Sequence, residues 1–489
     1  MPYQSPNILS NTTKKRTNIK EITLPMGLIG IFGLIHLVFY FVISTNNAFH
    51  SDDLQILTEL RQFGYYHFLE NPTNFEFPLV LPGHILIYKI LGNSGDPTLI
   101  NMFIYLSNLL SFYLLLTTLN INKTNSIIGS LFCISALYTF VRASNGWGNV
   151  SYWVAGQLPY FFSLNYILLG IFFLCKYCKM QEKYLFFIAS VLLFLTFNIK
   201  INLSLVIVIY GLMYYYLYRN KMGYFYNSRQ IIIENKDKII ILGVIIILST
   251  MWLFGNPGNF KRLQTQGTHQ INWNLVKNLK LTALGMFEYF KTTFTNVRLF
   301  ISAILLSIYF YQLETRFDKL VLVRKIHIHA TTYILALFSQ TALISLLFNK
   351  STYFDNRFYF FIDIATLLFL CCLFLFIYEK LSFNLNRLLT NTFLLLSILY
   401  LIKFDYRIFA ISKEFKKIHS ENIKIIKTHK IKKTTDDVFL KKNPYCFILG
   451  FPPIVNKTER DTGDSVNDFH TQNYKLEKYF HTSFKLFSE

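Results

Sequence analysis

The chain has 489 residues, and its composition argues against an ordinary soluble protein. Hydrophobic residues make up 53% and charged residues only 15%, against roughly 25% charged residues in average globular chains. The formal net charge is +21, but no nucleic-acid-binding motif accompanies it, so we expect no nucleic-acid partner. We interpret the Lys and Arg residues as loop charges that set the topology of a protein in a lipid bilayer.

The N-terminal region predicts a membrane span rather than a cleaved signal peptide. The apolar run 24–44 is longer than the apolar core of a signal peptide, and no small-residue cleavage site follows it. Several Lys and Arg residues precede this run. Because cytoplasmic flanks are rich in Lys and Arg, we expect residues 1–23 to be cytoplasmic.

Further apolar runs predict an all-α polytopic membrane protein with about 11 transmembrane helices. The predicted spans are 24–44, 99–119, 126–141, 157–175, 184–199, 201–218, 239–254, 297–313, 328–348, 359–378 and 390–403. The connecting segments are basic on one side, whereas the first long loop on the other side, 45–98, is acidic. This alternation predicts an odd number of spans within a transmembrane domain over 24–403, and a periplasmic C-terminal segment over 404–489.

The long periplasmic loops contain sequence patterns of their own. In the first loop, the apolar stretch 77–92 is short and interrupted by Pro and Gly, which predicts an interfacial or re-entrant helix. The second long loop, 255–296, has an amphipathic portion near 275–293. The C-terminal segment has mixed character, and we expect it to form a small α/β unit.

An acidic pair, Asp52-Asp53, follows the first predicted span and is the first candidate for chemistry. Carboxylates at the membrane edge act as general bases, bind divalent cations or orient sugar hydroxyls. The same residues have a structural interpretation, in which Ser51 or Asp52 caps a helix over 54–63. The two interpretations are compatible, because a cap holds a carboxylate in place.

A second candidate is the aromatic segment 144–160, SNGWGNVSYWVAGQLPY. Aromatic faces stack on sugar rings and amide side chains bond hydroxyls, so this segment predicts a carbohydrate site. The structural alternative is an interfacial aromatic belt. The candidate sugar-binding residues are Trp147, Tyr152, Trp153, Gln157 and Tyr160.

Basic residues in three external segments are candidates for binding a lipid phosphate or for pairing with the acidic residues. The Gly- and Pro-rich turn after 255 contains Asn259, Lys261 and Arg262, a combination that suits a phosphate or pyrophosphate. Lys200 lies in a tight hairpin between two predicted spans, where a charge needs a partner such as Asp52 or Asp53. Arg357 follows Asp355 and binds either that residue or a lipid phosphate.

Two further ionisable residues lie inside predicted spans. Asp363 is a functional candidate because charged side chains are costly within a membrane. His36 lies inside the first predicted span. We interpret it as a core histidine that bonds to a neighbour.

These features together resemble the GT-C superfamily of membrane glycosyltransferases, which use polyprenyl-phosphate sugars. The shared features are the acidic pair, the number of spans, a short external turn between the fifth and sixth spans, and the external C-terminal segment. More narrowly, the chain is similar to an uncharacterised bacterial family of polytopic proteins. The motifs that carry this resemblance are Asp52-Asp53, Trp153-x-x-Gly156-x-x-Pro159-Tyr160, Pro257-Gly258-Asn259-x-x-Arg262 and the tail around Pro452-Pro453.

The resemblance implies a glycosyltransferase of the bacterial inner membrane. It would transfer a sugar from a polyprenyl-phosphate carrier to a glycan or lipid acceptor of the cell envelope. Asp53, or alternatively Asp52, would be the catalytic base. Lys261, Arg262 or Arg357 would contact the lipid phosphate.

The metal requirement and the function each have an alternative. The second acidic motif of many GT-C enzymes is not evident, so we expect metal-free inverting transfer, with Mg²⁺ or Mn²⁺ as the alternative. Other functions that suit the sequence are a transporter or flippase for lipid-linked glycans and an O-antigen-type polymerase or ligase.

Overall fold

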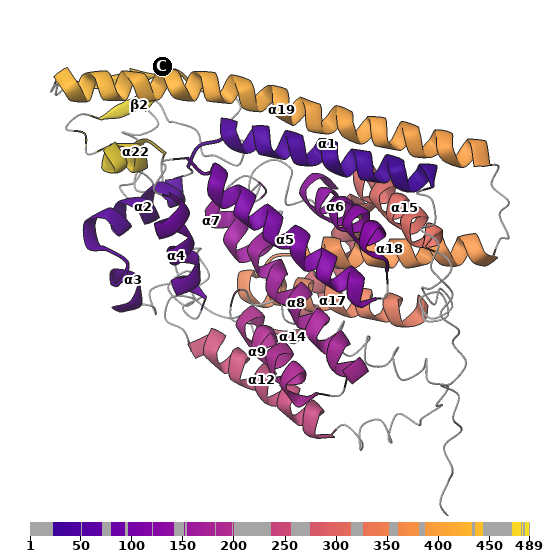
Figure 1. Ribbon diagram of the computed structural model, residues 1–489. Helices are drawn as coiled ribbons and strands as arrows, with labels where there is room; N and C mark the ends of the chain where they lie inside the picture. Colours follow the sequence, from indigo (N-terminus) through magenta and orange to yellow (C-terminus); the bar gives the residue numbers. More distant parts are fainter. Residues whose placement is uncertain are drawn as a thin grey trace, which may run out of the picture.

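A computed structural model shows a predominantly helical chain (Figure 1). It describes residues 23–49, 51–70, 80–92, 96–119, 121–140, 151, 154–180, 182–197, 199, 236–255, 274–313, 326–351, 360–380, 387–432, 436–443, 472–480, 482 and 485–488. Within these residues the β structure is a single two-stranded sheet. The described part of the chain is therefore mostly helical, with a small β component.

Four helical stretches among the described residues are long and apolar enough to cross a membrane. They are α1 (Leu24–Asn46), α5 (Thr98–Thr118), the continuous run Val154–Tyr177, and α18 (Phe360–Lys380). The run contains α7 (Val154–Gln157), a π-helical turn η4 (Leu158–Phe162) and most of α8 (Ser163–Met180). A fifth span results if α14 (Leu275–Phe294) and α15 (Val297–Gln312), which are bent by 71°, cross together.

The described residues thus confirm the membrane class but not the predicted number of spans. Four other helices also lie where spans were predicted. They are α6 (Lys123–Phe140), α9 (Lys183–Phe197), α12 (Lys236–Gly255) and α17 (Ile326–Phe348). The predicted span 201–218 lies outside the described residues.

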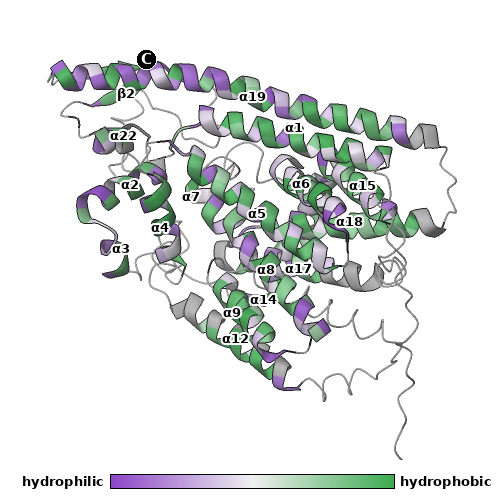
Figure 2. Ribbon diagram, viewed as in Figure 1, coloured by the Kyte–Doolittle hydropathy of each residue, from purple (hydrophilic) through white to green (hydrophobic). Residues whose placement is uncertain are grey.

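The longest helix, α19 (Arg387–Lys432), runs beside α1 (Figure 1). Its 46 residues contain neither Gly nor Pro, and at 1.5 Å per residue they extend about 69 Å. The apolar part of a bilayer is only about 30 Å thick. Accordingly, one half of α19 is mainly apolar and the other half mixes apolar and polar residues (Figure 2). The predicted boundary between residues 403 and 404 falls inside this continuous helix.

The two long loops contain the helices that the sequence pattern indicated. The first loop holds α2 (Ser51–Phe63), α3 (His67–Glu70) and α4 (Leu81–Leu91). Helix α4 lies within the predicted interfacial stretch, and α14 coincides with the predicted amphipathic portion.

The end of the chain folds back onto the first loop. Strands β1 (Val438–Leu440) and β2 (Leu486–Ser488) pair in parallel, and α22 (Gln472–Phe480) packs against α2. Asn422 of α19 anchors this unit by accepting from the backbone N–H of Lys441 and donating to its carbonyl oxygen, both at 2.9 Å. Figure 1 shows α22 and β2 beside the C-terminal end of α19.

Close helix packing in the membrane domain depends on small residues. At Gly129 of α6, an added Cβ would overlap the hydroxyl end of Tyr309 on α15. The Tyr309 hydroxyl donates to the carbonyl oxygen of Asn125 at 2.8 Å, so the ring is held in place. By contrast, nothing lies within 4 Å of a Cβ added at Gly83 in α4.

We therefore expect opposite effects from two Gly→Ala substitutions. Gly129→Ala should lower stability by about 1–3 kcal/mol, because it overpacks a buried contact. Gly83→Ala should be neutral or stabilise by about 0.5–1 kcal/mol, because it removes a flexible residue from a helix. Thermal unfolding of the purified protein in detergent measures both. Equal effects at the two positions would contradict the packing described.

Candidate functional site

The acidic pair lies in the first turn of α2, directly after the chain leaves α1. Asp53 is fully buried, whereas Asp52 is exposed. Helix α2 begins at Ser51, so both carboxylates belong to the first helical turn rather than preceding a helix that starts at 54. The N-terminal end of a helix is a favourable position for acidic side chains.

Asp53 connects three segments that are distant in the sequence. Its Oδ1 accepts a hydrogen bond from the Tyr88 hydroxyl at 2.5 Å and another from the backbone N–H of Ala155 at 2.7 Å. Tyr88 belongs to α4, and Ala155 belongs to α7 inside the predicted aromatic motif. One buried carboxylate therefore joins the first loop to the start of a membrane-spanning run.

The Tyr88 hydroxyl is suited to remain a donor. Burial and the neighbouring charge of Asp53 raise the pKa of Tyr88 well above 10.0, so the phenol keeps its proton. His84 lies one turn earlier on the buried face of α4. Burial lowers the pKa of His84 from 6.5 to about 3, which keeps its imidazole neutral.

Gln157 and Tyr160 lie inside the protein. The Gln157 Nε2 donates to Asn101 Oδ1 at 2.9 Å and to the Ser151 carbonyl oxygen at 2.8 Å. Its Oε1 lies 3.4 Å from the hydroxyl of Tyr40, which donates to it. The ring of Tyr160 is buried edge-on against Phe360. The described contacts of these two residues are with protein groups, and their predicted role in sugar binding stays a prediction.

The other predicted site residues lie outside the described part of the chain. They are Trp147, Tyr152, Trp153, Lys200, Asn259, Lys261, Arg262 and Arg357. Their contacts with the acidic pair or with a lipid phosphate therefore stay predictions.

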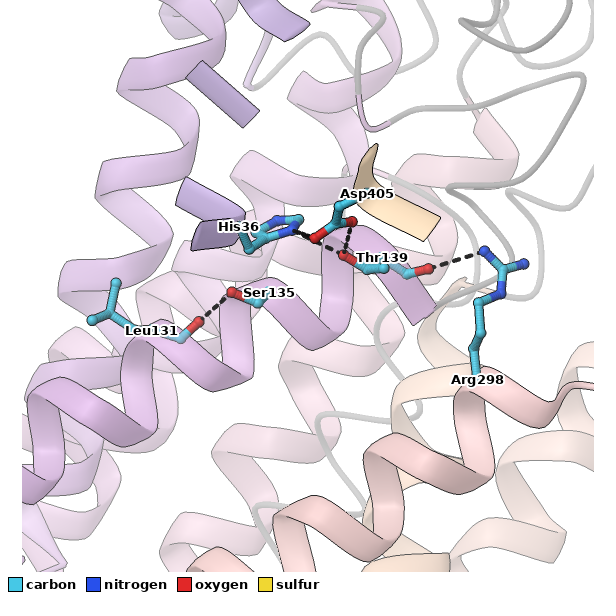
Figure 3. A network of polar contacts seen from close by, with 6 residues as sticks. All are labelled: His36, Leu131, Ser135, Thr139, Arg298 and Asp405. Atoms are coloured by element: carbon cyan, nitrogen blue, oxygen red, sulfur yellow. Dashed lines mark hydrogen bonds and ion pairs between the residues drawn. The ribbon is translucent and has the colours of Figure 1, made fainter. Parts of the chain in front are cut away.

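A buried polar network that the sequence did not indicate lies within the membrane domain (Figure 3). His36 Nδ1 of α1 lies 2.9 Å from Asp405 Oδ2 of α19 and 3.0 Å from Thr139 Oγ1 of α6. The Thr139 hydroxyl donates to Asp405 Oδ1 at 3.2 Å. Three helices therefore meet at one carboxylate.

Arg298 of α15 completes this network. Its Nη1 donates to the carbonyl oxygen of Thr139 at 3.2 Å, and its guanidinium group lies 4.1 Å from the ring centroid of Phe404. Phe404 directly precedes Asp405 on α19, so Arg298 contacts the same turn of the helix as the carboxylate. The sequence predicted that His36 bonds to a neighbour. It did not predict that the partner is Asp405, because Asp405 lies beyond the last predicted span.

Asp363 has partners within the helix bundle. Its Oδ1 accepts from the hydroxyl of Tyr289 on α14 at 2.7 Å, and the same hydroxyl lies 3.0 Å from Thr366 Oγ1. All three groups are buried. This contact links α14 to α18 and gives the predicted functional candidate a structural role.

The C-terminal unit holds the outer end of the acidic helix. Arg61 Nη2 in the last turn of α2 donates to the Tyr479 hydroxyl of α22 at 2.8 Å. The guanidinium group of Arg61 also lies 4.5 Å from the centroid of the same ring. Leu54 and Leu57 of α2 share a buried cluster with Leu476 of α22. Helix α2 is therefore fixed at both ends, by Asp53 and by Arg61.

No group of three or more His, Cys, Asp or Glu residues is positioned to hold a metal ion within the described residues. In the comparisons with known proteins, no family model matches the chain. No curated protein and no solved structure matches it either. The resemblance to GT-C enzymes thus rests on the sequence motifs alone.

Removing the Tyr88 hydroxyl should destabilise the site. Tyr88→Phe leaves the ring in place but removes a hydrogen bond to a buried carboxylate, which contributes about 1.5–3 kcal/mol. The loss should appear as a lower unfolding temperature in detergent. Tyr65→Phe is the matched control on the same loop, because the Tyr65 hydroxyl donates only to an uncharged backbone oxygen, that of Pro82. A Tyr88→Phe effect no larger than that control would contradict a structural role for the Asp53 contact.

His84 should make stability depend on pH. Its pKa is about 3 in the folded chain and about 6.5 when unfolded. The unfolded chain therefore binds the extra proton between these values, and stability should fall as the pH decreases from 6.5 towards 3. One such group contributes at most about 1.4 kcal/mol per pH unit. In unfolding measurements across this range, His84→Leu should flatten the dependence, and an unchanged slope would refute the assignment.

Proposed function

We propose that the protein is a membrane glycosyltransferase that moves a sugar from a polyprenyl-phosphate carrier to a glycan or lipid acceptor of the cell envelope. The observation that carries the proposal is the unequal environment of the acidic pair. One carboxylate is fixed inside the protein and its neighbour is exposed, directly beyond a membrane-spanning helix. That location suits a reaction between a lipid-linked donor and an acceptor in the adjoining aqueous phase.

The two carboxylates receive different roles in this proposal. Asp52, which is exposed, accepts the proton of the acceptor hydroxyl while the hydroxyl oxygen attacks the anomeric carbon of the donor. The bond between that carbon and the lipid phosphate oxygen breaks, and the phosphate leaves on the polyprenyl chain. Asp53 is a positioning residue, because its bonds to Tyr88 and Ala155 set the orientation of the first turn of α2. The sequence had slightly favoured Asp53 as the base, and its burial motivates the reversal.

The surrounding structure supports this assignment. A base must be held in place to contribute fully to catalysis, and α2 is restrained at both ends by α4, α7 and α22. Arg262 and Arg357, which lie outside the described part of the chain, are among our candidates for stabilising the negative charge on the departing phosphate.

The test is sugar transfer by membranes containing the full chain, with radiolabelled polyprenyl-phosphate hexoses as probes, with and without chelator. Asp52→Asn should lower the rate at least about 100-fold, because general-base catalysis typically contributes 10²–10⁴-fold. Asp53→Asn should lower both the rate and the unfolding temperature, because it also weakens the contact with α4 and α7.

Glu59→Gln is the matched control on the same helix. Glu59 is a partly buried carboxylate that accepts from Gln55 at 2.8 Å, within α2. Its substitution should leave the transfer rate within about twofold of wild type. Undiminished transfer by Asp52→Asn would refute the assigned base. Movement of the labelled lipid across the membrane without a new glycosidic bond would favour a transporter instead.

A further inference from the structure

Polar aromatic side chains gather in the interior of the membrane domain between α1, α5 and α6. Tyr40 and His36 of α1, Tyr105 of α5 and Tyr138 of α6 are each at most 2% exposed. The ring centroids of Tyr40 and Tyr105 lie 4.6 Å apart, and that of Tyr138 lies 4.8 Å from Tyr40 and 5.1 Å from Tyr105. His36 lies 6.1 Å from Tyr105 by the same measure. The four side chains therefore form one cluster.

Several polar atoms of this cluster have no hydrogen-bond partner among the described residues. They are His36 Nε2 and the hydroxyl oxygens of Tyr105 and Tyr138. The Tyr105 hydroxyl approaches Ser135, and the Tyr138 hydroxyl approaches Asn108 and the hydroxyl of Tyr40, without meeting hydrogen-bond geometry. Buried polar groups in native proteins nearly always bond to protein or ordered water. Three such atoms in one cluster therefore call for a common partner.

The orientation of His36 is fixed by its other nitrogen. Asp405 and Thr139 both lie within 3.0 Å of Nδ1, so the ring cannot turn to satisfy Nε2 without losing those contacts. When one nitrogen of a histidine binds a ligand such as a metal, a carboxylate commonly accepts a hydrogen bond from the other nitrogen and fixes the ring. The contacts of Nδ1 with Asp405 and Thr139 thus hold the His36 ring in one orientation.

We propose that this cluster is a buried hydration site, in which ordered water bonds His36 Nε2 and the hydroxyls of Tyr105 and Tyr138. Internal water makes about three hydrogen bonds to otherwise unsatisfied buried groups, and this cluster supplies three from three helices. The cluster offers one imidazole nitrogen and two hydroxyls, which together act as acceptors and donors.

Hydrogen-bonded polar groups also connect the cluster to the acidic end of the domain. Tyr40 bonds Gln157, Gln157 bonds Asn101, and Ala155 near Gln157 bonds Asp53. Polar groups therefore extend from the acidic pair into the cluster.

The opposite direction along α1 is apolar. One turn from His36, Phe32 is fully buried and packs at 6.3 Å against the ring of Phe132 on α6. Ile29 and Met26 continue this buried apolar cluster towards the start of α1. Polar contacts therefore link the cluster to the acidic end of the domain, and apolar side chains border it along α1 in the other direction.

The first test uses the full wild-type chain in detergent. Millisecond X-ray pulses convert water beside a side chain into hydroxyl radicals, and mass spectrometry locates the modified residues. Tyr105 and Tyr138 should be modified at least several-fold faster than Phe132, which is equally buried and lies in the apolar cluster. Modification of the two tyrosines no faster than that of Phe132 overturns the proposal.

The second test uses the sign of a stability change. If the hydroxyls bond water, Tyr105→Phe and Tyr138→Phe should lower the unfolding temperature. If the hydroxyls are dry and unpaired, the same substitutions remove an unfavourable buried group and should raise it. Tyr309→Phe is the control for a paired hydroxyl and should lower the temperature. A rise for Tyr105→Phe and Tyr138→Phe overturns the proposal, whatever the outcome of the transfer assay.

Discussion

The hydrogen-bonded contact between His36 and Asp405 holds α1 against α19, and much of the architecture depends on it. Hydrocarbon offers no partner for a carboxylate, so displacement of either helix along the other would leave Asp405 exposed to a strongly unfavourable environment. Two further bonds continue the same seam, from Asn46 to Ser412 at 3.1 Å and from Lys416 to the carbonyl of Thr45 at 2.8 Å. The seam therefore fixes the register of the two helices.

Because both sequences advance in the same direction along this seam, α1 and α19 are parallel. The segments that follow the two helices consequently emerge together. Helix α2 with the acidic pair and α22 of the C-terminal unit can thus pack against each other, although more than 400 residues separate Arg61 from Tyr479.

The sequence predicted what depends on local pattern. Apolar runs located α1, α5, α8 and α18, and the interrupted stretch after 77 indicated α4. Contacts between distant residues carry no such signal: Asp53 and Tyr88 are 35 positions apart, and His36 and Asp405 are 369 apart. Asp405 was assigned to the periplasmic C-terminal segment, because the last predicted span ended at residue 403. The spacing of Leu401, Asp405, Ile408, Ser412 and Phe415 on one helical face, with no Gly or Pro nearby, was the signal that could have placed it.

Because α19 is continuous, the number of residues along it determines the direction in which the C-terminal unit lies. Each residue turns the chain by about 100° and advances it by about 1.5 Å. Asp405 faces α1 and α6 inside the protein, and Asn422 faces the backbone after β1 on the same rigid helix, 17 residues further along. One residue inserted between them would swing the outer unit by more than a quarter of a turn, whereas four inserted residues would nearly restore its direction but lift it by about 6 Å. Length variation in this helix is therefore constrained by angle more than by distance.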